Sequence, residues 1–116
     1  MSAILDADQT KARELFDVNV FAPVNMIQAF SRLLVATQGT IVNIGSYVDA
    51  LPVPWQGIYN ASKAALRSIT DNLRLELRPF EVKVVYVRPQ NLLPSLKFRL
   101  LTIFIDRGGR NSKQFP

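Results

Sequence analysis

Tyr59 and Lys63 are the residues of this chain whose types and spacing best suit chemistry. They lie in the segment GIYNASKAAL, residues 57–66, which is predicted to form the first turns of a helix. Side chains four positions apart share one face of a helix, so we expect the phenol and the ammonium to be neighbours. An ammonium about 4 Å away, at an effective dielectric of about 20, favours the phenolate by roughly 4 kcal/mol, or about three pKa units. Tyr59 would then act as a general acid or base near neutral pH.

A Tyr-x-x-x-Lys pair is a weak signal by itself, because short motifs also occur by chance. The alternative interpretation is an exposed tyrosine packed along a lysine stem. The surrounding elements must decide between the two interpretations.

Two long helices and two short strands are predicted around this pair. Apolar residues with helical spacing cover 9–36, and a second helix covers 57–78 until Pro79 stops it. The β-branched runs over 40–44 and 82–87 are typical of buried strands. A strand, a long helix and a second strand form a right-handed parallel βαβ unit. The predicted fold class is therefore α/β.

The same patterns predict how the elements pack. The wide apolar arc over 9–36 indicates burial on two sides, by a sheet and by another helix or subunit. In the loop over 47–56, Trp55 either lines an apolar substrate pocket or covers the core from the surface. The helix over 57–78 has one apolar stripe that we expect to face the core, formed by Ile58, Ala61, Ala65, Ile69, Leu73, Leu77 and Phe80.

Ser46 and Asn19 are predicted to lie near the pair. Ser46 follows the first strand, and ligands of open α/β sheets bind at the carboxyl ends of the strands. Pro23 has no N–H, so it leaves the carbonyl oxygen of Asn19 without its helical donor and is expected to kink the helix there. A tolerated kink without any function is the alternative.

The runs DVNV (17–20), IVNIGS (41–46) and YNASK (59–63) together resemble the short-chain dehydrogenase/reductase superfamily, and the resemblance covers about residues 8–89. It implies that Tyr59 exchanges a proton with the carbonyl or hydroxyl oxygen of the substrate, while hydride passes to or from a nicotinamide.

The resemblance also implies the roles of the other candidates. Lys63 would hold the ribose hydroxyls of the nicotinamide cofactor together with Tyr59, and Ser46 would hydrogen-bond the reacting oxygen. The backbone carbonyl of Asn19 would hold a water that relays protons to Lys63. Pro89, at the end of the second strand, is a further cofactor-binding candidate.

The glycine-rich turn that holds the cofactor pyrophosphate in this superfamily, Gly-x-x-x-Gly-x-Gly, does not occur in the sequence. We therefore expect a central-to-C-terminal fragment, with a partial Rossmann-like doubly wound parallel sheet that lacks the nucleotide-binding half. Residues 1–90 are the expected catalytic segment. Residues 91–116 are expected to be a divergent basic tail, partly disordered, with a weak strand or helix over 96–105.

Within the superfamily, Phe21 and the runs GTIV (39–42), SKAA (62–65) and LELRPF (75–80) are most similar to fungal NADPH-dependent 1-acyldihydroxyacetone-phosphate reductases. Animal 17β-hydroxysteroid dehydrogenases come next. This similarity implies NADP(H) rather than NAD(H), and an acyl-dihydroxyacetone phosphate or another lipid ketone as substrate. It also implies a cytoplasmic protein associated with the endoplasmic reticulum or lipid droplets.

The composition argues against several other classes. The chain has no cysteine and no histidine, which removes disulfides, Ser-His-Asp triads and most metal sites. Its net charge is +5, but residues 1–90 hold nine basic and eight acidic residues, so the excess lies in the tail and no nucleic-acid partner is expected. We expect neither a signal peptide nor a membrane span, which needs about 20 apolar residues.

Two functions stay open. The first is an NAD(P)(H)-dependent oxidoreductase that reduces a carbonyl. The second is a non-catalytic truncated remnant, since a half-sheet leaves apolar helix faces uncovered. In the superfamily, the helices that match 9–36 and 57–78 form a four-helix dimer interface. Such a remnant would therefore form a homodimer through these helices or bind a full-length relative.

Overall fold

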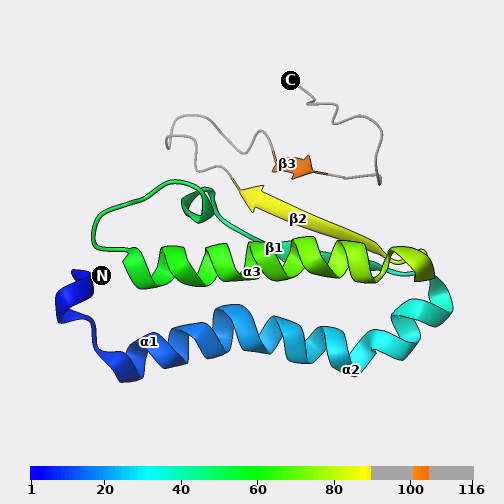
Figure 1. Ribbon diagram of the computed structural model, residues 1–116, viewed down its shortest axis with the longest axis horizontal. Coiled ribbons are helices and arrows are strands. Elements are labelled where there is room, and N and C mark those ends of the chain that lie inside the picture. The colour runs from blue at the N-terminus through cyan, green and yellow to red at the C-terminus, as the bar shows by residue number, and fades with distance from the viewer. Residues whose placement is uncertain (90–100, 105–116) are drawn as a thin grey trace.

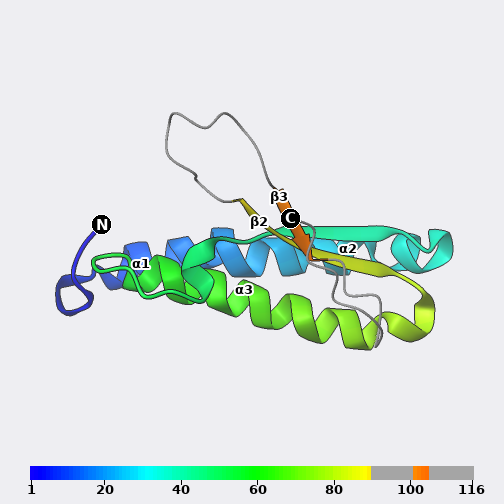
Figure 2. The same ribbon diagram turned by 90° about the horizontal axis from the view of Figure 1, so that it is seen from above.

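The computed structural model describes residues 1–89 and 101–104 of the chain. Two long helical rods lie side by side and run in the same direction along a small sheet (Figures 1 and 2). The first rod consists of α1 (Gln9–Phe16), the π-helical segment η2 (Asp17–Phe21) and α2 (Ala22–Thr37). The second rod is α3 (Gly57–Glu76). Short 3-10 turns occur at η1 (Ile4–Asp6), η3 (Tyr47–Asp49) and η4 (Arg78–Phe80).

The sheet contains three strands in the order β1-β2-β3. β1 (Thr40–Ile44) pairs in parallel with β2 (Lys83–Pro89), in a register that runs from Thr40 opposite Lys83 to Ile44 opposite Val87. This confirms the predicted parallel βαβ unit, with α3 as the crossover. The start of α3 and the carboxyl ends of both strands consequently lie at the same end of the molecule (Figure 1).

A third strand, β3 (Leu101–Phe104), was not part of the predicted two-strand sheet. It pairs antiparallel with β2. It lies within residues 96–105, for which the sequence predicted either a weak strand or a weak helix. Its residues, LTIF, have high β-propensity, and the outer edge of β2 offers unpaired backbone groups to them. Apart from β3, the tail predicted over 91–116, including its expected disorder, falls outside the described residues.

The hydrophobic core lies between one face of the sheet and the two helical rods. Strand β1 alternates, with Ile41 and Asn43 buried while Val42 and Ile44 are each 53% exposed. Both rods therefore cover the same face of β1, and its other face is open. The core consists of Ile41, Val82 and Val84, packed against Ile27, Leu34, Val35, Leu73 and Leu77.

The buried face of α3 coincides with the predicted apolar stripe only in part, since Leu73 and Leu77 of that stripe pack against the core. Its fully covered residues are Ser62, Leu66 and Thr70, whereas Ala61 is exposed and Ile69 lines a groove between α2 and α3. Polar side chains can face the core here because their hydrogen-bonding groups have partners. Thr70 Oγ1 donates to the carbonyl of Leu66 at 2.7 Å and accepts from Asn43 Nδ2 at 2.9 Å.

The helix predicted over 9–36 is present but is interrupted by η2. The N–H of Ala22 donates to the carbonyl of Asp17, five residues earlier, which is the hydrogen-bond spacing of a π-helix. This irregularity lies immediately before Pro23, which has no N–H to offer to Asn19. The predicted kink thus takes the form of a π-helical segment.

Most of the first rod is uncovered in this chain. Val20 is its one buried residue, although the rod contacts both β1 and α3, the sheet and the helix expected on its two sides. By length and composition, Gln9–Thr37 is long and apolar enough to cross a membrane. This finding corrects the expectation that the sequence contains no stretch of that kind. A core helix of a soluble protein passes the same test. The exposed apolar residues of the rod include Val18, Phe21, Met26, Phe30 and Leu33.

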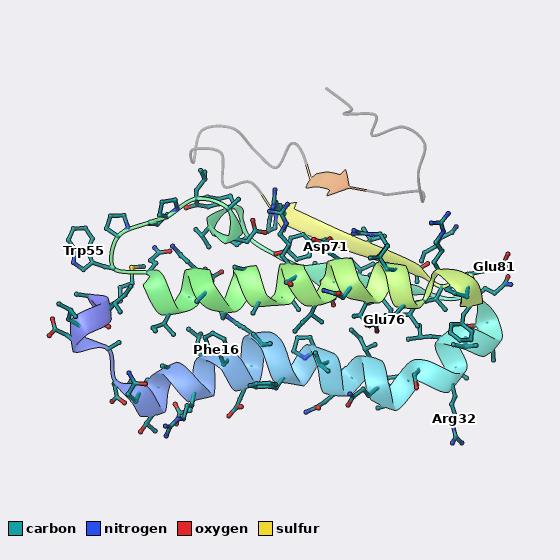
Figure 3. All side chains as sticks on the ribbon, in the orientation of Figure 1. Phe16, Arg32, Trp55, Asp71, Glu76 and Glu81 are labelled. Atoms are coloured by element: carbon teal, nitrogen blue, oxygen red, sulfur yellow. The ribbon has the colours of Figure 1, made fainter. Side chains whose placement is uncertain are left out.

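Trp55 lies in the loop between η3 and α3 and points away from both helices (Figure 3). Its side chain is 66% exposed and its φ is +61°, a conformation that is rare for a bulky residue. It lines neither the groove between α2 and α3 nor the groove along β1 and the first rod, and it does not cover the core. Neither interpretation offered by the sequence is therefore confirmed.

Gly45, directly after β1, leaves room for the ring of Tyr86. A Cβ on Gly45 would lie 2.1–2.4 Å from that ring, which is buried and cannot move aside. We predict that Gly45→Ala lowers the free energy of unfolding by about 1–3 kcal/mol, measured by urea denaturation. Gly39→Ala is the control, because its nearest atom, 3.0 Å away, belongs to the flexible Leu34 side chain. Equal stability of the two variants would contradict this packing.

Candidate active site

Helix α3 places Tyr59 and Lys63 next to each other, as predicted. Lys63 Nζ lies 5.8 Å from the centroid of the Tyr59 ring, within the range of a cation–π contact. The same nitrogen donates to the carbonyl oxygen of Ile44 at 3.2 Å. Partial burial lowers the pKa of Lys63 below its ordinary value of 10.5, because the charged form loses hydration. The ammonium therefore bridges the first turns of α3 and the end of β1.

Asn19 reaches the site through its side chain. Its Nδ2 donates to Ser62 Oγ at 3.1 Å, and Ser62 Oγ donates to the carbonyl of Tyr59 at 2.7 Å. This chain of hydrogen bonds connects η2 to the turn of α3 that carries Tyr59. The predicted role of Asn19 concerned its backbone carbonyl, and that role stays a prediction.

Ser62 is a site residue that the sequence reasoning missed. It is completely buried and links two of the predicted residues. Its position in YNASK, three residues after Tyr59 and one before Lys63, was the available signal. A serine at that spacing can accept from a neighbouring segment while it donates to the preceding turn of its own helix.

Ser46 is buried at the carboxyl end of β1, as predicted. Its Oγ accepts from the N–H of Val48 at 3.5 Å and caps η3. Gly45 N donates to the carbonyl of Val87 at 2.7 Å, so strand pairing continues up to the residue before Ser46. Within the part of the chain that the structure describes, Ser46 has no side-chain hydrogen bond to Tyr59 or Lys63. Its contact with a reacting oxygen stays a prediction.

Pro89 is the exposed last residue of β2, where it pairs with Leu101 of β3. Because Ile44 lies opposite Val87, the chain reaches Ser46 and Pro89 after two more residues on each strand. Pro89 thus lies at the same end of the sheet as the other candidates. A cofactor contact at Pro89 is a prediction that follows from this position.

A groove of about 490 Å³ lies along β1 and the first rod. Both Asn19 and Lys63 line it, whereas Tyr59, Ser46 and Pro89 do not. Its other walls are mainly apolar, so one ammonium faces an otherwise hydrophobic surface. The remaining lining residues are Val18, Pro23, Met26, Ile27, Phe30, Leu34, Thr40, Ile41, Val42, Asn43, Ile44 and Leu66.

A buried ionic cluster beside Ser46 was also missed by the sequence reasoning. Arg88 Nη2 lies 2.7 Å from Asp49 Oδ1, and the hydroxyl of Tyr86 donates to Asp49 Oδ2 at 2.7 Å. The sequence signal was the alternation of Tyr86 and Arg88 on one strand, which points both side chains to one face. Among the described residues, no group of three or more carboxylates lies close enough to hold a metal ion.

Comparison with known proteins identifies the family. The sequence model of the short chain dehydrogenases matches residues 1–97. The short-chain dehydrogenase ptmH of Penicillium ochrochloron is 53% identical over 85 residues, which are 72% of this chain and 31% of that protein. The crystal structure of a metagenomic short-chain oxidoreductase in complex with NADP superposes with a TM-score of 0.72 at 29% identity, covering 78% of this chain and 42% of that one.

The NADPH-dependent 1-acyldihydroxyacetone phosphate reductase of Schizosaccharomyces pombe is less similar. It is 40% identical over 83 residues, which are 72% of this chain and 28% of that protein. The expectation that such reductases resemble the chain most is thus wrong, since the Penicillium ochrochloron protein is more similar. The chain spans about a third of the length of these curated relatives. With the family match over most of its residues and the predicted partial Rossmann-like fold confirmed, the chain belongs to the short-chain dehydrogenase family.

Proposed function

We propose that this chain carries the proton-transfer site of an NAD(P)(H)-dependent oxidoreductase that reduces a carbonyl, with Tyr59 as the general acid. One observation carries the proposal: the Lys63 ammonium is held between the Tyr59 ring and the carbonyl of Ile44, at the carboxyl end of β1. A cation held beside the phenol would stabilise the negative charge that develops on its oxygen as the proton leaves during the reaction.

The residues present fit the nicotinamide side of such a cofactor. Lys63 offers an ammonium in an apolar groove, where it would bind ribose hydroxyls, with Tyr59 beside it and Pro89 at the same sheet end. When bound, the cofactor supplies a hydride to the carbonyl carbon. Tyr59 gives its phenolic proton to the carbonyl oxygen, which Ser46 hydrogen-bonds, so the product is an alcohol. The glycine-rich pyrophosphate cradle is not among the residues of this chain.

The finer features of the reaction are proposed from similarity to relatives. A related crystal structure holds NADP and a curated relative is NADPH-dependent, which supports NADP(H) rather than NAD(H). The same relative supports an acyl-dihydroxyacetone phosphate or another lipid ketone as substrate. A cytoplasmic protein that associates with the endoplasmic reticulum or lipid droplets suits such a substrate.

A second candidate function is that of a non-catalytic remnant that dimerises or binds a full-length relative. The observation that favours it is an uncovered groove of about 630 Å³ between α2 and α3. Its apolar walls include Phe21, Ile27 and Ile69. Apolar surface of this kind is typical of a face that a partner covers.

Cofactor binding separates the two functions. We predict that NADPH binds the purified chain saturably. The fluorescence of the sample should change as NADPH is added and then reach a plateau. Tyr59→Phe should then lower carbonyl reduction by about 10²–10⁴-fold and leave the affinity for NADPH nearly unchanged, because only the acid is lost. The absence of saturable binding at millimolar cofactor would reject catalysis by this polypeptide and favour the second function.

Dimerisation through the α2–α3 groove predicts a dimer in size-exclusion chromatography. Ile69→Glu, which puts a charge into the groove, should convert it to a monomer. Leu75→Glu is the matched control, because Leu75 lies on the same helix, is 69% exposed and does not line the groove. A monomeric unmodified chain would reject the dimer.

The environment of Lys63 predicts a lowered pKa in solution. After reductive methylation with ¹³C-formaldehyde, NMR should show that the Lys63 signal titrates at a lower pH than the signals of the other methylated lysines, because partial burial disfavours its charged form. At pH values between the two pKa values, a larger fraction of Lys63 is therefore neutral than in a free lysine. Lys63→Arg assigns the signal by removing it. A Lys63 signal that titrates together with the other methylated lysines, or at a higher pH, would contradict the geometry.

A further inference from the structure

We infer that Asp49, together with Tyr86 and Arg88, is a positioning cluster that holds the Ser46 turn against the Lys63 turn of α3. The importance of those two turns rests on the proposed function. The existence of the cluster rests on contacts alone. None of its three residues lines the groove that Lys63 and Asn19 line, so they would act through Ser46 and Lys63.

Asp49 is the centre of the cluster. Its side chain is fully buried, although it carries a carboxylate. Arg88 Nε donates to Oδ2 at 3.0 Å while Arg88 Nη2 lies 2.7 Å from Oδ1, so the guanidinium faces both oxygens. Arg67 Nη1, from α3, lies 3.6 Å from Oδ1. A single carboxylate thus connects η3, β2 and α3.

Tyr86 joins this carboxylate to the two candidate turns. Its hydroxyl donates to Asp49 Oδ2 and lies 3.3 Å from the carbonyl oxygen of Lys63. Its ring occupies the space beside Gly45 that a side chain would fill, directly before Ser46. Burial and the neighbouring Asp49 carboxylate raise the pKa of Tyr86, so its hydroxyl remains a donor.

The turn that follows Ser46 depends on Asp49 at its far end. Asp49 N donates to the carbonyl of Ser46 at 3.2 Å, and Ser46 Oγ accepts from Val48 N. This is a single 3-10 turn that does not continue into a longer helix, so its conformation depends on contacts with other elements. Asp49 lies in the turn, and its side chain makes such a contact by pairing with Arg88 of β2.

A buried ion pair is a poor general stabiliser, because apolar residues of similar volume often do as well. What it does supply is a defined geometry, since its oxygens and guanidinium nitrogens must meet in fixed directions. The cluster is therefore expected to control the order of the Ser46 turn more than the stability of the whole fold.

Amide hydrogen exchange on the full chain tests this inference. In Asp49→Asn, the turn amides of Val48, residue 49 and Ala50 should exchange roughly tenfold faster relative to the reference amides of Leu77 and Lys83. Both reference amides are hydrogen-bonded outside the cluster. Asp71→Asn is the control, because Asp71 also pairs with arginines but its side chain is 52% exposed. It should leave this ratio unchanged.

The double variant Asp49→Asn/Arg88→Met separates positioning from stability. It removes the buried Asp49 charge together with its partly buried partner charge on Arg88, so the reference amides should recover the exchange rates of the unmodified chain. The turn amides should stay fast, and the ¹³C-methyl signal of Lys63 should titrate closer to the signals of the other methylated lysines as its surroundings open. If Asp49→Asn fails to fold, the double variant alone decides.

Three results would overturn the inference. They are equal acceleration of all amides in Asp49→Asn, no acceleration at all, or full recovery of the turn amides in the double variant. None of these depends on activity. A chain that fails to bind NADPH would reject the proposed function while the exchange pattern still decides the role of Asp49.

Discussion

The parallel pairing of β1 with β2 is the constraint on which the candidate site depends. Two parallel neighbours require a crossover, and α3 makes it by returning along the full length of the strands. The first turns of α3 must then lie beside the end of β1. Lys63 can therefore reach the carbonyl of Ile44, and a local Tyr-x-x-x-Lys spacing becomes part of a site built from three segments.

The chain combines a well-connected end with an uncovered surface. At the carboxyl ends of the strands, Asn19, Ser62, Tyr59 and Lys63 are linked through hydrogen bonds and close contacts. Along the first rod and the open face of β1, apolar side chains such as Phe30, Leu33 and Val42 are at least half exposed. The linked residues at the strand ends support a catalytic function, and the uncovered apolar surface supports binding to a partner. Both functions stay open because the chain spans about a third of the length of its curated relatives.

Local patterns predicted much of this structure, and long-range contacts account for what they missed. The strand over 40–44 and the Tyr59–Lys63 pair follow from periodicity within a few residues, and both are confirmed. The apolar stripe predicted for α3 is confirmed in part: Leu73 and Leu77 pack against the core. Thr70 lies outside the stripe and also faces the core, because it accepts a hydrogen bond from Asn43, 27 residues away. The cluster around Asp49 depends on a partner 39 residues along the chain. No local pattern encodes such pairings.

The central claim is that the ends of β1, α3 and η2 form one cofactor-binding and proton-transfer site. The most direct test is the ¹H–¹⁵N spectrum of the labelled chain during addition of NADPH. The account predicts that the largest shift changes occur at Asn19, Ser46, Tyr59 and Lys63. Changes confined to the α2–α3 groove, or a spectrum that does not change at millimolar NADPH, would contradict it.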